Sequence, residues 1–168
     1  MEHYYHNYTN LFKACQEFDG FFIDFITFEG LFSGCTGIVE VSSNFLPATY
    51  AKRNIYKNMF RGCTSLVAAP ELPATTLSES CYEGMFYGCT SLVTAPVLPA
   101  TELADYCYAS MFGGCTSLVN APVLPATELA DYCYASMFRD CTSLVNAPAL
   151  PATTLVSGCY SGMFYGCT

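Results

Sequence analysis

The sequence predicts an α/β repeat fold: a leucine-rich-repeat-like solenoid with a parallel β-sheet on one face and short helices on the other. Three observations predict it: a gapless repeat with a period of 26 positions, a short proline-interrupted strand in each repeat, and a helical spacing of apolar residues after that strand. Stacked repeats of this length bury a continuous core that no single repeat could form alone.

The repeat is clearest from Cys63 onward. Blocks that begin at Cys-Thr-Ser-Leu-Val span residues 63–88, 89–114, 115–140 and 141–166, so that equivalent residues lie 26 positions apart. Every block carries a constant Leu, the tetrapeptide Leu-Pro-Ala-Thr and a Met-Phe pair. Two columns of cysteines run through the array, at Cys63, Cys89, Cys115, Cys141 and Cys167 and at Cys81, Cys107, Cys133 and Cys159. We therefore expect residues 63–168 to form four repeats and the start of a fifth.

The pattern weakens toward the N-terminus. Residues 35–62 read as a diverged repeat, with Leu-Pro-Ala-Thr and Met-Phe in place but Ile55 where later blocks carry the second Cys. Residues 1–34 read as a diverged N-terminal cap, because the end unit of a stack has one face without a neighbour. The last block stops two residues after it begins, which we interpret as a truncated array or one capped by another molecule.

Within each block the periodicity should change twice, from a short strand through a turn to a helix. The segment from Leu66 to Leu72 is short, β-branched and interrupted by Pro70, which favours a short strand. After Leu-Pro-Ala-Thr, whose Thr suits a helix N-cap, apolar residues recur at helical spacing. They are Leu103, Cys107, Met111, Phe112 and Cys115, at i, i+4, i+8, i+9 and i+12. A helix of ~3 turns follows from this stripe.

The motif Met-Phe-x-x-Cys-Thr-Ser-Leu resembles the BspA-like leucine-rich repeats and related 26-residue repeats of bacterial surface proteins. The resemblance covers residues 35–168, and the positions that match the general pattern in one block are Cys89, Leu92, Ala95, Leu98, Pro99, Phe112 and Cys115. The chain departs from that pattern in carrying Ala where Ile is preferred and in a longer segment that ends in Met-Phe. The resemblance implies adhesion or protein–protein contact, a location at the cell surface or outside it, and no shared active site.

The composition of the chain limits the kinds of partner that it can bind. Hydrophobic residues make up 52% of the chain, charged residues 12%, and the net charge is −8. From Cys63 onward Arg139 is the one basic residue against eight acidic ones, which argues against binding to nucleic acid. The most apolar segment, from Phe21 to Phe32, contains two acidic residues and is too short for membrane insertion. The N-terminus does not have the pattern of a signal peptide, so the localisation stays open.

Eleven cysteines raise the question of disulfides or a metal. Cysteines of one column point the same way, at ~4.8 Å spacing, whereas a disulfide needs side chains that converge. There is no Cys-x-x-Cys knuckle and the repeats contain no His, so zinc is disfavoured. We expect buried free thiols that act as small apolar side chains.

Other candidate metal or catalytic groups have simpler interpretations. His3 and His6 could bind a metal, but a frayed aromatic terminus is favoured. Calcium between coils is possible at two acidic columns, although a solvated face is favoured; these columns are Glu102, Asp105, Glu128 and Asp131. The absence of His from the repeats removes Ser-His-Asp and Cys-His nucleophiles. We predict no catalytic, cofactor or metal site.

The remaining hypothesis is a non-catalytic module that binds a protein or glycan through the sheet face, as an adhesin or surface-display repeat would. Its alternative is a structural spacer that self-associates end to end, and ice binding by the Thr columns is a distant third. Tyrosines that follow the second Cys either bind a partner or stack between coils. The candidate binding residues are Thr94, Val97, Tyr106, Asn120, Val123, Tyr132 and Asn146.

Overall fold

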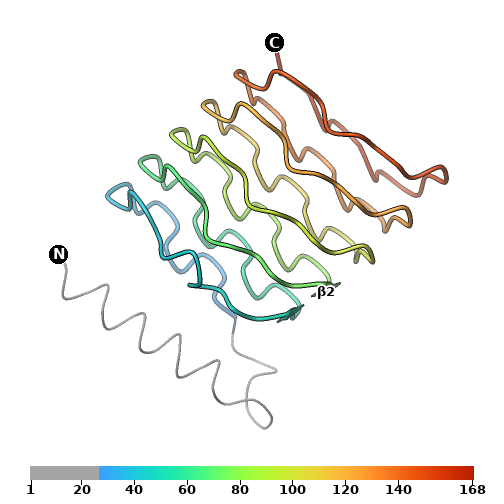
Figure 1. Cartoon of the computed structure of the whole chain (residues 1–168), viewed down its shortest axis with the longest axis horizontal. Helices are drawn as coiled ribbons and strands as arrows, with labels where there is room; N and C mark the ends of the chain where they lie inside the picture. The colour runs from blue at the N-terminus through green and yellow to red at the C-terminus, as the bar shows by residue number, and fades with distance from the viewer. Residues whose placement is uncertain (1–26) are drawn as a thin grey trace, which may run out of the picture.

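The computed structural model describes residues 27–168, so most of the predicted N-terminal cap lies outside the described residues. Within this range the chain winds into flattened coils that stack side by side in sequence order, from blue near residue 30 to red at the C-terminus (Figure 1). Equivalent residues of neighbouring coils are 26 positions apart, as in the parallel pairing of Ala68 with Thr94 and of Thr94 with Asn120. The sequence period is therefore also the length of one coil.

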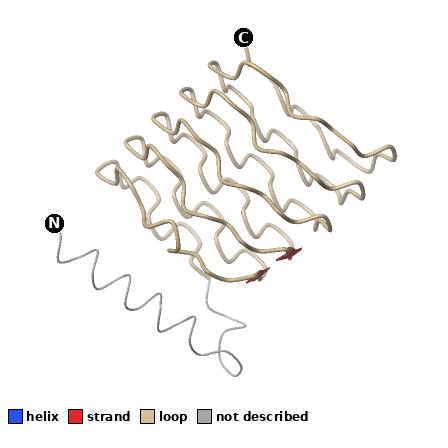
Figure 2. Ribbon diagram, viewed as in Figure 1, coloured by secondary structure: helices blue, strands red, loops and turns tan. Residues whose placement is uncertain are grey.

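The predicted fold class, with short helices on one face of a parallel sheet, is wrong. No residue between 27 and 168 lies in an α-helix, and the two strands of this range are β1 (Tyr50–Ala51) and β2 (Thr76–Leu77). The strands pair in parallel, Tyr50 with Thr76 and Ala51 with Leu77. Almost all of the described chain is drawn as loop and turn, with the two strands together at one corner (Figure 2).

The part of each coil where a helix was expected is a run of linked β-turns, which we call the turn segment. It comprises residues 53–63, 79–89, 105–115, 131–141 and 157–167. Its N–H groups alternate between two kinds of acceptor. The N–H of Met85 donates to the carbonyl of Tyr82 three residues back, and that of Phe86 donates to the carbonyl of Met111 in the next coil, at 2.9 Å. The backbone groups are thus satisfied without the i to i−4 bonds of a helix.

Positive φ angles at every fourth residue explain why a helix cannot form. In one coil they occur at Ser80, Gly84 and Gly88, with φ of 55°, 60° and 73°. Each is the third residue of a turn, the position at which a type II turn requires a positive φ. An α-helix needs negative φ throughout, so the apolar residues repeat every four positions rather than every 3.6.

The predicted strand is reduced to single bridges. Isolated parallel bridges join one residue per coil, at Ala68, Thr94, Asn120 and Asn146. Two residues after each bridge stands a proline, such as Pro70 or Pro96, which has no N–H to donate to a ladder. The same residues that made the sequence favour a short strand therefore stop the sheet from extending.

The core lies between the bridged segment and the turn segment. In the inner coils the constant Leu, Cys, Met and Phe positions are almost fully buried, for example Leu92, Cys107 and Met111. Rings stack coil upon coil in two ladders, with neighbouring centroids 5.5–5.9 Å apart. The ladders are Phe60, Phe86, Phe112, Phe138 and Phe164, and Tyr56, Tyr82, Tyr108, Tyr134 and Tyr160.

Candidate functional site

An exposed face runs along the bridged segments of the coils. We call it the ladder face and define it by Val93, Thr94 and Val97 and the residues at the same positions of the other coils. Thr94, Asn120 and Asn146 lie next to one another in the row of parallel bridges, and all three are exposed. Val97 and Val123 are each 78% exposed, so they belong to the surface and not to the core. The structure thus places five of the seven candidate binding residues on one face.

Apolar side chains dominate this face. A column of valines next to the bridged residues is 37–71% exposed in four successive coils, at Val67, Val93, Val119 and Val145. Scattered exposed apolar residues are ordinary on protein surfaces, but contiguous rows of them mark interaction sites. The Thr and Asn side chains beside the valines can supply hydrogen bonds that orient a ligand.

The other two candidates, Tyr106 and Tyr132, lie apart from the ladder face. They belong to the turn segment, beyond the Leu-Pro-Ala-Thr turn, and are 40% and 37% exposed. Their rings stack on each other with centroids 4.9 Å apart and planes 3° apart. The tyrosines after the second Cys behave differently: Tyr82, Tyr108 and Tyr134 are buried. For that column the structure shows the stacking alternative.

Of the two acidic columns, the aspartates bond to the backbone of the next coil. Asp105 accepts the backbone N–H of Asp131 at 3.0 Å, and Asp131 accepts that of Ser157 at 3.1 Å. Glu102 and Glu128 are exposed. Among residues 27–168, no three His, Cys, Asp or Glu side chains are arranged to hold a metal ion. The aspartates therefore have a structural role between coils that their sequence spacing did not reveal. His3 and His6 lie outside the described residues.

Basic residues near the N-terminal side pair with acids one coil further on. Arg53 contacts Glu79 at 3.0 Å and Lys57 contacts Glu83 at 2.9 Å. Both pairs join residues 26 apart in sequence. Such partly exposed pairs contribute little energy each, but they leave few free cations on this surface.

The described cysteines are free thiols, and most are buried. The thiols of the first column donate to phenylalanine carbonyls of the preceding coil, as Cys89 does to Phe60 at 3.1 Å and Cys115 to Phe86 at 3.2 Å. Burial raises the pKa of Cys89 to about 12 and that of Cys133 to about 11. These thiols stay protonated at neutral pH, so they are poor nucleophiles and poor metal ligands.

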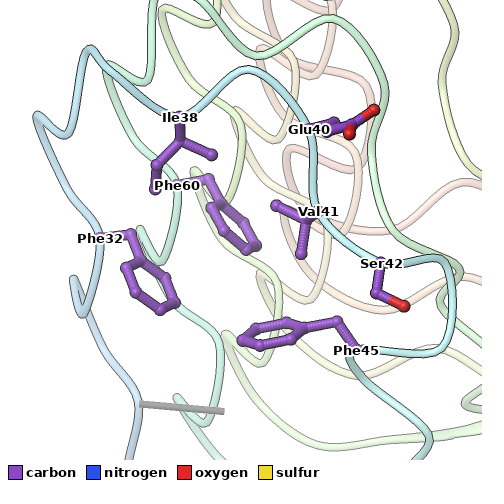
Figure 3. A pocket seen from close by; sticks show the side chains of 7 residues that line it. All are labelled: Phe32, Ile38, Glu40, Val41, Ser42, Phe45 and Phe60. Carbon is purple, nitrogen blue, oxygen red and sulfur yellow. The ribbon is translucent and has the colours of Figure 1, made fainter. Parts of the chain in front are cut away.

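A cavity of about 210 Å³ opens near the N-terminal side of the described range. Figure 3 shows aromatic and aliphatic side chains around it, with Glu40 and Ser42 as its polar groups. The Ser42 hydroxyl donates to the Asn44 side chain at 2.6 Å and not to the Glu40 carboxylate. The hydroxyl is therefore not paired with a base, and the cavity does not assemble a nucleophile. Its lining residues are Phe32, Ile38, Glu40, Val41, Ser42, Phe45 and Phe60.

The fold and its surfaces define a stacked-coil repeat protein. No family model, curated protein or solved structure matches the chain. The resemblance to BspA-like repeats stays a prediction from the motif. Within residues 27–168 there is no helix with the length and apolarity that a membrane crossing needs.

Proposed function

We propose that this chain is a non-catalytic binding module that recognises a protein or glycan through the ladder face. The observation that carries the proposal is the bridged row of Thr94, Asn120 and Asn146 beside exposed valines. The bridged row varies from coil to coil, as Ala68, Thr94, Asn120 and Asn146, while the valines beside it and the core positions around it are nearly constant. A rigid framework with a variable exposed row is the arrangement that repeat proteins use for recognition.

The physical chemistry of the face suits binding. Neighbouring rows are ~4.8 Å apart, so a ligand that crosses several coils meets Val, Thr or Asn at regular intervals. The valines supply apolar area that is already exposed, and their β-branched side chains lose little conformational freedom on contact. Asn120 and Asn146 each offer both a donor and an acceptor.

The properties of the thiols argue against catalysis as the role of the repeats. The most frequent nucleophile candidates are the cysteines, and those at Cys81, Cys107 and Cys115 are fully buried. Burial raises the pKa of each of these thiols. The sequence from Cys63 onward contains no His to activate them.

The test replaces Asn120 and Asn146 by arginine together. The wild-type protein and the N120R/N146R variant are screened on the same glycan array and the same panel of purified proteins. A matched control, S157R/S161R, adds the same two charges at exposed positions of the turn segment. We expect binding of wild-type ligands to weaken at least tenfold in N120R/N146R and to be kept in the control.

Thermal unfolding shows whether each variant is folded. Equal binding by N120R/N146R and wild type, with both folded, would remove the ladder face as the binding surface. Equal loss in both arginine variants would indicate a general charge effect and would also contradict the proposal.

A further inference from the structure

Tyr106 and Tyr132 occupy backbone positions that tyrosine disfavours. Their φ angles are 57° and 54°, in the left-handed region. At the same position of other coils stand the smaller residues Asn54, Ser80 and Gly158, of which Asn and Gly adopt this region most readily. A bulky residue there is conformationally strained, and both rings are exposed rather than part of the core. Surface exposure with a conformational cost indicates a role other than packing.

Tyr106 and Tyr132 stack on each other, and they differ in what lies on their other faces. Tyr106 stacks on Tyr132 at 4.9 Å. The opposite side of Tyr132 lies against Gly158, where even a single added Cβ would collide with the ring. Tyr132 is therefore covered on both sides. Among residues 27–168, no other ring and no cation lies against the second face of Tyr106.

The chain itself shows what such a ring accepts. The Arg61 guanidinium lies over the ring of Tyr87 at 4.3 Å, and that of Arg139 lies over Tyr165 at 4.8 Å. In both cases the arginine comes from the coil before the tyrosine, 26 positions earlier. These are cation–π contacts. For Tyr106 the equivalent residue 26 positions earlier is Ser80, a neutral side chain that is itself buried, so no arginine stands at the position that holds one for Tyr87 and Tyr165.

The charges around the pair also favour a cation. Between Arg61 and Arg139 the chain has no basic residue. Two of the acids in this interval, Glu79 and Glu83, are neutralised by Arg53 and Lys57. The acids in the interval are Glu71, Glu79, Glu83, Glu102, Asp105, Glu128 and Asp131.

The aspartates beside the tyrosines keep their charge available. Asp105 and Asp131 directly precede Tyr106 and Tyr132 in the chain, and among the described residues neither forms an ion pair. Each uses one carboxylate oxygen to accept a backbone N–H of the next coil. The other oxygen can accept from an ammonium or guanidinium group.

We propose that Tyr106, Tyr132, Asp105 and Asp131 form a second binding site, which takes an arginine or lysine side chain from a basic segment of a partner protein. The cation lies on the face of Tyr106 away from Tyr132, and the two aspartates add negative charge to this part of the turn segment. The site is on the turn segment, so it does not depend on the ladder face or on the proposal made for it.

The experiment measures binding of a fluorescein-labelled peptide of alternating arginine and glycine by fluorescence anisotropy. The variant Y106S/Y132S carries at both positions the residue that the chain itself has at Ser80, so it keeps a backbone that suits a positive φ. We expect this variant to bind at least fivefold more weakly and to unfold at the same temperature as the wild type or higher. Y106F/Y132F keeps the rings and is expected to bind within twofold of the wild type.

Two further variants test whether the aspartates contribute to binding and whether binding requires this particular pair of tyrosines. D105N/D131N keeps the amide oxygen that accepts the backbone N–H, and we expect weaker binding with a smaller dependence on salt. Y50L removes an exposed tyrosine elsewhere, which is 49% exposed, and should bind as the wild type does. Equal binding by wild type and Y106S/Y132S, or no binding by the wild type, would overturn the proposal. Tyr106-dependent binding of a neutral oligosaccharide, maltohexaose, without peptide binding would overturn the cationic assignment.

Discussion

At the residue scale, the cysteine column that includes Cys63 and Cys89 shows why a thiol recurs at a buried position that another small apolar side chain could also fill. The Phe60 carbonyl accepts the N–H of Cys63 at 3.0 Å and also the S–H of Cys89 at 3.1 Å. A carbonyl has two lone pairs, and the thiol satisfies the second one from the next coil. Cysteine thus combines apolar volume with a weak donor. Alanine would keep the fold but lose this bond and leave a small cavity.

The same thiols should make stability depend on alkaline pH. Burial raises the pKa of Cys89 from 9.0 to about 12 in the folded protein, while the unfolded thiol ionises near its ordinary value. Above pH 9 the unfolded chain therefore binds fewer protons than the folded chain, and the free energy of unfolding falls as pH rises. The contribution is complete below pH 9 and is lost as pH rises toward 12.

Urea unfolding in the presence of a reducing agent, at pH 7 and pH 10.5, measures this loss. One thiol with this shift accounts for roughly 2 kcal/mol at pH 10.5, and the other buried thiols and tyrosines act in the same direction. The variant Cys89→Ala should lose less stability between the two pH values than the wild type does. Equal stability of the wild type at both pH values would show that the buried thiols do not ionise on unfolding.

At the scale of the element, the turn segment is where prediction from sequence failed. Cys107, Met111 and Cys115 are four residues apart, a spacing that fits both a helix of 3.6 residues per turn and a turn repeat of four. Over so short a segment the two periods give nearly the same stripe of apolar residues. The distinguishing signal was present in the residues with positive φ, at Ser80, Gly84 and Gly88. Residues tolerant of left-handed backbone at every fourth position indicate turns rather than a helix.

Replacing Gly88 distinguishes a run of turns from a helix in this segment. Its φ is +73° and an added Cβ would meet no atom closer than 3.8 Å, so conformation and not space decides the outcome. Alanine should destabilise the protein by about 1 kcal/mol and asparagine by less, because asparagine tolerates the left-handed region. In a helix the order would be reversed, with alanine the most favourable of the three residues.

Thermal and urea unfolding of the wild type, Gly88→Ala and Gly88→Asn give the order directly. Asp140, at the position of Gly88 two coils further on, already has a φ of 57°, which supports the choice of asparagine as the matched variant. A Gly88→Ala variant more stable than the wild type would contradict the turn structure.

At the scale of the whole molecule, the sequence predicted the repeat period. It did not predict the backbone conformation between the constant residues of each repeat. Leu92, Cys115 and Phe112 recur every 26 positions and are fully buried, because stacking brings equivalent residues together whatever the local structure. The exposed row at Thr94 and Asn120 followed from the same alignment of blocks. Contacts between different positions of neighbouring coils, such as Cys89 with Phe60, depend on turn geometry that the spacing does not specify.

The aromatic pair illustrates the same limit. Its sequence positions suggested binding residues, but only the structure separates Tyr106 and Tyr132 from the ladder face. It also shows that Gly158 covers one side of the stack. A side chain that leans toward the next coil brings residues about one period apart into contact. The sequence alone does not show whether a side chain contacts the preceding coil or the next one, so it does not identify such a pair.

Stacking of equivalent coils leads to a prediction about whole-block deletion. Removing residues 89–114 joins Gly88 to Cys115, which repeats the native Gly-Cys junction. Tyr82 would then stack on Tyr134 as it now stacks on Tyr108. The stability of a repeat array is approximately a sum over its units and their interfaces. We therefore expect the shortened protein to fold, with a lower free energy of unfolding and a smaller urea m-value, since less surface is buried.

Deletion of residues 89–101 is the control. It removes half as many residues but leaves a coil in which a bridged segment is missing, so the turn segment from Asp105 onward cannot stay in register with its neighbours. Urea unfolding monitored by far-UV circular dichroism should show a greater loss of stability for this half-block deletion than for the whole-block deletion. If the shorter deletion were the milder one, the coils would not be the units that set the stability of this protein.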